Sequence, residues 1–190
     1  FVIPPTTLVP SFDTTPPHVA YPDNPCSGLF CDDFDANTGL YQFQRNQTDY
    51  QHARPWNITY ITKWNDYYYG AAHSGSGYAI VVPMATTAYQ AEIRTKPIDT
   101  SSCEDGVEVS FQYRGKTVST GYFDIEVSYD GFESSTALLG GALDPALVMW
   151  TAATFTVASK PQPLQVRFVC SAGITVDNYC AIDSLQIACV

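Results

Sequence analysis

A run of oxygen-bearing side chains near the start of the chain has the spacing of a cation site. Asp33, Asp35 and Asn37 occupy every second position, and Gly39 follows. An EF-hand loop begins in this way, but it needs its glycine at position 6 and a bidentate glutamate at position 12. Here the glycine comes one place late, and Gln44 stands where the glutamate is required. An EF-hand is excluded, so these acids are either solvated turn residues or ligands of another kind of cation site.

Groups suited to catalysis are few and scattered. The three histidines are His18, His52 and His73, and the Ser-Gly-Ser-Gly segment after His73 lacks the preceding Gly-x of a nucleophile elbow. Asp124 and Glu126 are two residues apart on an expected strand, where a pair of acids ordinarily forms a solvated face rather than an acid/base pair. The sequence therefore predicts that this protein is not an enzyme.

Aromatic side chains gather in a short stretch before Gly70. Its members are Trp56, Trp64, Tyr67, Tyr68 and Tyr69. Such rings can stack on sugars, or they can pack across strands within a sheet. The first alternative predicts a secreted carbohydrate-binding module that loses glycan binding when Trp64 or Tyr68 is replaced by alanine.

The cysteines and sequons indicate an oxidising compartment. The cysteine number is even, with no Cys-x-x-Cys pair and no histidine nearby, which disfavours zinc and favours disulfide bonds. The six are Cys26, Cys31, Cys103, Cys170, Cys180 and Cys189. Sequence alone leaves about 15 possible connectivities. Asn46 and Asn57 each begin an Asn-x-Thr sequon, so we expect an extracellular, eukaryotic glycoprotein with N-linked glycans.

The charge balance excludes two classes of partner. The formal net charge is −10 with only 9 basic residues, which argues against nucleic acid and anionic membrane surfaces. No apolar run is long enough to span a membrane. The chain begins at Phe1 rather than Met, so we expect a mature protein whose signal peptide has been removed.

Residues 1–25 differ in amino-acid composition from the rest of the chain. They hold seven of the 13 prolines together with large apolar side chains, among them Phe1, Ile3, Leu8, Val9 and Phe12. An extended segment of this length spans about 75 Å, whereas a compact domain of the remaining size is about 40 Å across. The sequence therefore predicts an arm that docks on a neighbouring copy, head to tail, which forms a filament unless the rotation closes a ring. The alternatives are an arm wrapped on its own domain and an O-glycosylated Thr/Pro stalk.

From residue 26 onward, short alternating segments lie between Gly, Asp, Ser and Pro turns, which is typical of a two-sheet β-sandwich. The expected strands are Tyr41–Arg45, Tyr78–Val82, Ala88–Thr95, Val107–Tyr113, Gly121–Tyr129, Ala152–Ala158, Leu164–Cys170 and Ala181–Cys189. Helical periodicity is nearly absent, apart from a possible turn after Asp144-Pro145.

Six motifs in order make residues 26–190 resemble a divergent MAM domain, an extracellular jelly-roll module. The matching pieces are Cys31-Asp32-Asp33-Phe34-Asp35, the segment from His73 to Tyr78, Cys103 with Phe111-Gln112-Tyr113, Gly121 to Ile125, the strand at Trp150, and Ala181-Ile182-Asp183-Ser184-Leu185 closing at Cys189. The family's second terminal aspartate is Ser184 here, and the Cys170–Cys180 pair is not part of the usual pattern.

The resemblance implies an all-β, two-sheet antiparallel jelly-roll sandwich with Cys26–Cys31 and Cys103–Cys189 bridges, leaving Cys170–Cys180 as an additional one. It also implies that an opening-strand acid, Asp33 or Asp35, can meet Asp183 to hold a structural calcium ion. Related jelly rolls serve as carbohydrate-binding modules, so the fold does not decide the function. The sequence thus predicts a secreted structural or adhesive protein that self-assembles through residues 1–25. The alternatives are a carbohydrate-binding module and a fragment of a larger enzyme or receptor.

Overall fold

The structure, a computed structural model, describes ten segments of the chain. They are residues 28–34, 41–45, 56–59, 63–64, 67–68, 71–81, 90–117, 121–143, 149–171 and 178–190. Residues 1–25, Cys26, Asp35, Asn46 and the turn expected after Asp144 lie outside the described residues. Assembly through the arm therefore stays a prediction, as does the boundary between the arm and the domain.

The described residues form strands and no helix. The strands are β1 (Phe30–Asp32), β2 (Tyr41–Arg45), β3 (Asn57–Thr59), β4 (Lys63–Trp64), β5 (Tyr67–Tyr68), β6 (Tyr78–Val81), β7 (Gln90–Thr95), β8 (Val107–Lys116), β9 (Tyr122–Ser128), β10 (Thr136–Leu139), β11 (Thr151–Val157), β12 (Gln165–Ser171) and β13 (Tyr179–Cys189). Accordingly, no helix among the described residues could cross a bilayer.

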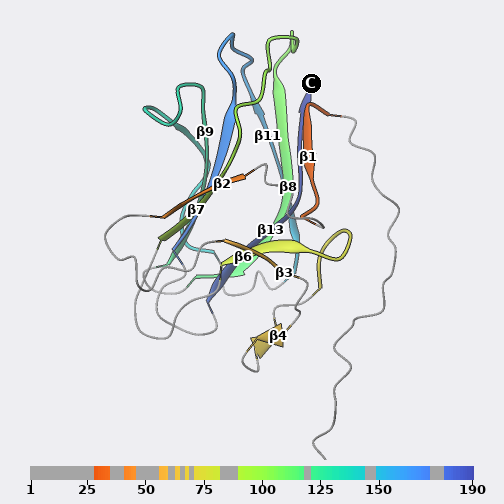
Figure 1. The fold of residues 1–190 in the computed structure, drawn as a ribbon, viewed down its shortest axis with the longest axis vertical. Helices are drawn as coiled ribbons and strands as arrows, with labels where there is room; N and C mark the ends of the chain where they lie inside the picture. Colours follow the sequence, from red (N-terminus) through yellow and green to blue (C-terminus); the bar gives the residue numbers. More distant parts are fainter. Residues whose placement is uncertain are drawn as a thin grey trace, which may run out of the picture.

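Two antiparallel sheets face each other (Figure 1). The first has the order β11-β8-β13-β6-β3, with β1 paired to β13, and the second has the order β10-β9-β12-β7-β2. Strands β4 and β5 form a separate two-stranded sheet. The predicted all-β, two-sheet antiparallel jelly-roll sandwich is confirmed.

Alternating apolar side chains place the core between the two sheets. Along β9, Phe123, Ile125 and Val127 are buried, whereas the residues between them are half-buried on the opposite face. The rings of Phe123 and Phe168 stack with centroids 6.5 Å apart, and Phe111 meets Phe168 edge-on at 5.3 Å. Burial of each such ring contributes about 1.5–3 kcal/mol, which makes this aromatic layer a main source of stability.

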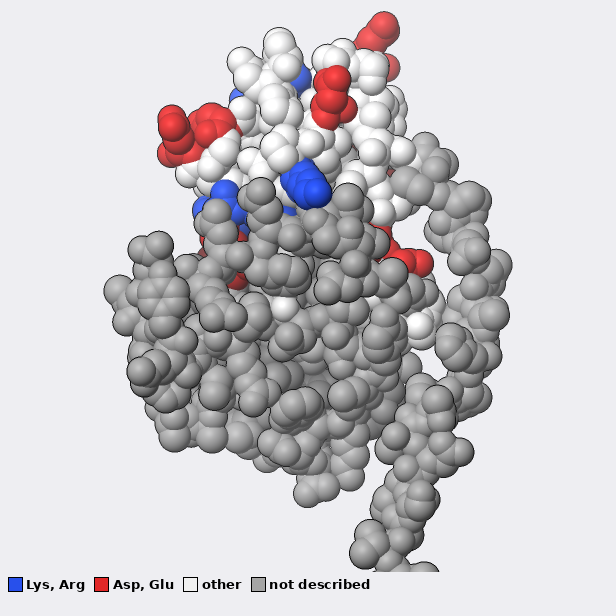
Figure 2. Space-filling view, viewed as in Figure 1, with Lys and Arg blue, Asp and Glu red and all other residues white. Residues whose placement is uncertain are grey.

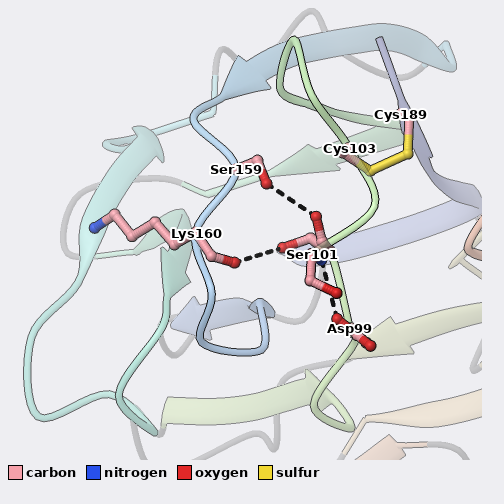
Figure 3. The surroundings of a disulfide bond; sticks show 7 residues. Asp99, Ser101, Cys103, Ser159, Lys160 and Cys189 are labelled. Atoms are coloured by element: carbon pink, nitrogen blue, oxygen red, sulfur yellow. Dashed lines mark hydrogen bonds between the residues drawn. A yellow bond between two sulfur atoms is a disulfide. The ribbon is translucent and has the colours of Figure 1, made fainter.

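Disulfide bonds reinforce the sandwich. Cys170 of β12 is bonded to Cys180 of β13, and therefore joins the two sheets inside the core. Cys103 is bonded to Cys189 and fastens the end of β13 to the turn before β8 (Figure 3). Cys103–Cys189 is a pair that the resemblance implies, and Cys170–Cys180 is the additional pair that it leaves. Cys31 is also disulfide-bonded, and its expected partner Cys26 lies outside the described residues. Bonded cysteines of this kind indicate an oxidising compartment.

Candidate functional site

The outer face of the five-stranded sheet collects charged and aromatic side chains from three strands. Because residues alternate along β9, the side chains next to the buried ones point away from the core. The strand register places Glu126 beside Arg167, and Arg167 beside Arg94. We call this set of side chains the polar face; it comprises Glu92, Arg94, Tyr122, Asp124, Glu126 and Arg167.

Ion pairs connect the strands across the polar face. Arg94 Nη2 lies 2.7 Å from Glu92 Oε1, and Arg167 Nη1 lies 3.4 Å from Glu92 Oε2. Arg167 also pairs with Glu126 through both Nε and Nη2. The four side chains are only 12–22% exposed, so they are partly withdrawn from water. A guanidinium held by two carboxylates keeps a fixed orientation, which is how donors are arranged to recognise a polar ligand.

The ring of Phe132 lies over this network. Its centroid is 4.3 Å from Cζ of Arg167 and 5.1 Å from Cζ of Arg94, within cation–π range. The residue has a φ of 72°, and its N–H donates to Ser128 Oγ at 2.9 Å. Asp130 also stabilises this loop through its hydrogen bonds. The bonds from Ser134 and Ser128 hold the pKa of its carboxyl well below the usual value. The half-buried ring is thus fixed beside the charged groups.

Tyr122 extends the polar face along β9. Burial raises the pKa of its phenol first, and the nearby carboxylates of Asp124 and Glu126 raise it further. Asp124 Oδ1 accepts a hydrogen bond from the N–H of Gly141 at 3.1 Å. The face therefore combines a phenol, carboxylates, guanidiniums and one apolar ring, which suits a flat ligand with several hydroxyl groups.

A second polar cluster lies on the other sheet, where β13 is irregular after Asp183. The Asp183 side chain is fully buried and accepts N–H bonds from His73 at 2.6 Å, Ser74 at 3.1 Å and Ser184 at 2.6 Å. Burial raises its pKa to about 7, with these N–H bonds opposing the rise and Asp33 adding to it. His73 Nδ1 also lies 3.1 Å from Ser184 Oγ. Asp183 therefore fastens the loop of His73 and Ser74 to the sheet.

The predicted calcium site falls in this cluster. The effect of Asp33 on the pKa of Asp183 places these two acids near each other, and Asp33 is exposed. Calcium requires six to eight oxygens, and both Asp183 oxygens already accept N–H bonds. The described residues contain no group of three or more acid, histidine or cysteine side chains suited to a metal. Asp35 lies outside the described residues, so calcium binding stays a prediction.

Aromatic packing also holds this loop. Arg114 is buried between rings, with Cζ 4.1 Å from the centroid of Trp150 and 4.9 Å from that of Tyr78. Trp150 Nε1 donates to the carbonyl of Ala71 at 2.9 Å, and its ring meets His73 edge-on. Burial lowers the pKa of Arg114, whereas Tyr78, Tyr179 and Asp183 raise it. These contacts form a small second core and give His73 a structural position.

The aromatic residues that the sequence singled out lie in different parts of the fold. Trp56 is 1% exposed, its Nε1 donates to the carbonyl of Ala91 at 3.3 Å, and its ring lies near Phe123. It is therefore a core residue, and packing rather than sugar stacking explains it. Trp64 pairs with Tyr67 between β4 and β5, but the side chains of this hairpin lie outside the described part of the structure.

Sequence reasoning missed Arg94, Arg167, Glu92 and Phe132 as site residues, and it read Asp124 and Glu126 only as a solvated face. One available signal was the scarcity of basic residues: two of the 9 in the chain lie mid-strand in β7 and β12. On the described surface seen in Figure 2, Lys and Arg are likewise few and scattered. Basic side chains that are half-buried within alternating strands indicate specific partners.

Comparison with known proteins identifies the fold and no family. No protein-family model matches the chain, and no curated protein is significantly similar to it. The K3 cleaved adhesin domain of Lys-gingipain from Porphyromonas gingivalis w83 aligns with a TM-score of 0.64 at 13% identity, covering 86% of this chain and 100% of that one. The MAM-like assignment therefore stays a prediction.

Two carbohydrate-binding modules share the fold as well. TmCBM61, solved in complex with beta-1,4-galactotriose, aligns with a TM-score of 0.51 at 11% identity, covering 79% of this chain and 88% of that one. The C-terminal family 22 carbohydrate-binding module of Clostridium thermocellum Xyn10B aligns with a TM-score of 0.51 at 15% identity, covering 85% and 92%. At such identities the likeness shows a common fold.

Proposed function

We propose that this protein is a non-catalytic, extracellular carbohydrate-binding domain whose polar face holds a neutral oligosaccharide. The observation that carries the proposal is the network in which Phe132 lies over Arg94 and Arg167 while Glu92 and Glu126 fix both guanidiniums. Sugar rings need an apolar surface to stack on and fixed donors and acceptors for their hydroxyls, and this face offers both side by side. The carbohydrate-binding modules of the same fold support this reading.

The charge of the polar face favours an uncharged ligand. Three carboxylates, from Glu92, Asp124 and Glu126, stand against two guanidiniums, and both guanidiniums are already paired with glutamates. A uronate or sulfated sugar would have to break those pairs and approach the remaining carboxylate. We therefore infer a neutral pyranose chain as the ligand class.

Binding to a glycan array and calorimetry with neutral oligosaccharides, such as galactotriose and xylo-oligosaccharides, test this proposal. The variants F132A and Y122A should each weaken binding at least about tenfold, which corresponds to about 1.4 kcal/mol. M149A is the matched control, because Met149 is 75% exposed and lies outside the polar face. Unchanged affinity in F132A and Y122A, or binding only to acidic glycans, contradicts the proposal. Binding that is lost in W64A instead places the site at the β4–β5 hairpin.

A further inference from the structure

Strand β11 is an edge strand of the six-stranded sheet in the part of the chain that the structure describes. It pairs along its whole length with β8, from Thr151 opposite Tyr113 to Val157 opposite Val107, with no bulge. On its other side it pairs with no strand of the described segments. Such an edge presents unpaired N–H and C=O groups that can add another strand.

Strands β10, β3 and β2 lie at other sheet edges and carry features that discourage strand addition, whereas β11 does not. β10 is four residues long with a register shift between Ala137 and Leu139, β3 is three residues long and begins at the sequon Asn57, and β2 ends in the charged Arg45. In contrast, residues 146–159 contain no charged side chain and no proline. Proteins usually protect edges with charge, proline, bulges or short strands, and β11 has none of them.

We propose that two copies of this chain pair through β11, antiparallel, about a two-fold axis at Thr154. The strand Thr-Ala-Ala-Thr-Phe-Thr-Val is self-complementary in this register. On the half-buried side, Ala153 of one copy lies opposite Phe155 of the other, so a small side chain meets a large one. On the exposed side, Thr154 lies opposite its own copy, a favourable cross-strand pair. The interface is isologous, as a two-fold dimer requires.

The neighbouring strand β8 is compatible with the same register. Glu108 is paired with Thr156, and Gln112 with Ala152. In the dimer Thr156 lies opposite Ala152 of the second copy, so Glu108 is in line with Gln112 of that copy rather than with a second Glu108. Each chain has a net charge of −10 and would repel another copy at acidic surfaces. The neutral β11 edge therefore offers an approach without opposed carboxylates.

Sedimentation velocity and light scattering of the full chain over a range of concentrations test the proposal. We expect a protein mass twice that of the 20.9 kDa chain, and its loss in T154K, which sets two ammonium groups opposite each other at the axis. T136K is the matched control, because Thr136 is an exposed threonine of β10 and the charge change is the same. It should remain dimeric. Circular dichroism verifies that both variants are folded.

The register is tested by cross-linking under mild oxidation. T154C should form a disulfide-linked dimer, whereas T156C should not, because Thr156 faces Ala152 of the second copy. A chain that is monomeric at every concentration overturns the proposal. An association that survives T154K but disappears when residues 1–22 are removed also overturns it, and identifies the N-terminal arm as the connector. Neither result depends on glycan binding.

Discussion

Removal of the Cys103–Cys189 disulfide by the double substitution C103A/C189A is expected to lower the free energy of unfolding by about 4 to 5 kcal/mol. The two cysteines are 86 residues apart, and cross-linking a loop of that length removes a large conformational entropy from the unfolded chain. The bond also fixes β13, the central strand that carries Asp183. Urea unfolding followed by tryptophan fluorescence measures the difference.

The structure around this bond suggests that the folded state survives its loss. The turn before β8 keeps its own hydrogen bonds: Ser159 Oγ donates to the carbonyl of Thr100 at 2.9 Å, and Ser101 N–H donates to Asp99 Oδ1 at 2.9 Å (Figure 3). The single variants C103A and C189A provide the control, since either one breaks the bond and each should cost nearly as much as the double variant. A loss below about 2 kcal/mol in the double variant would contradict the loop-entropy argument.

Much of the fold could be predicted because the core strands alternate clearly. The expected strand Gly121–Tyr129 is observed as β9, Tyr122–Ser128, where every second side chain from Phe123 to Val127 is buried. β10 was missed because Thr-Ala-Leu-Leu does not alternate and lies at an exposed or half-buried edge. β1 was missed because it is three residues long and exists through its pairing with β13. Such strands depend on a neighbour rather than on their own sequence.

The polar face could be predicted only in part. The alternation in β9 correctly placed Asp124 and Glu126 on the face away from the core. The alternation does not reveal what surrounds these two acids, because the other members of the network come from distant strands. Arg167 is 41 residues from Glu126 along the chain and 75 residues from Glu92. Phe132 reaches the same place from a loop with positive φ, for which the sequence carries no periodic signal. A site whose residues are brought together by strand register can be recognised only in the three-dimensional structure.

The free energy of unfolding is expected to fall as the pH rises from about 4 to about 7, because of Asp183. Its pKa is about 7 in the folded protein and about 3.9 in the unfolded chain, so between these values the folded state binds a proton that the unfolded state does not. Protonated Asp183 therefore stabilises the folded state at low pH, and this stabilisation is lost as the pH rises from about 4 to about 7. A difference of about three units between the folded and unfolded pKa values changes the free energy of unfolding by at most about 4 kcal/mol. His73 acts in the opposite sense, because burial lowers its pKa.

Unfolding by urea at several pH values, with EDTA present to remove divalent cations, measures this slope. D183N should abolish most of it, since the amide does not titrate. D33N should lower only the upper end of this pH window, because Asp33 is one of the causes that raise the pKa of Asp183 in the folded protein. The N–H groups of His73, Ser74 and Ser184 favour the ionised carboxylate, so the slope reports whether burial outweighs three hydrogen bonds. The opposite result is a free energy of unfolding that rises with pH in the wild type but not in D183N. It would show that the three hydrogen bonds outweigh burial and that Asp183 is charged when it holds the loop.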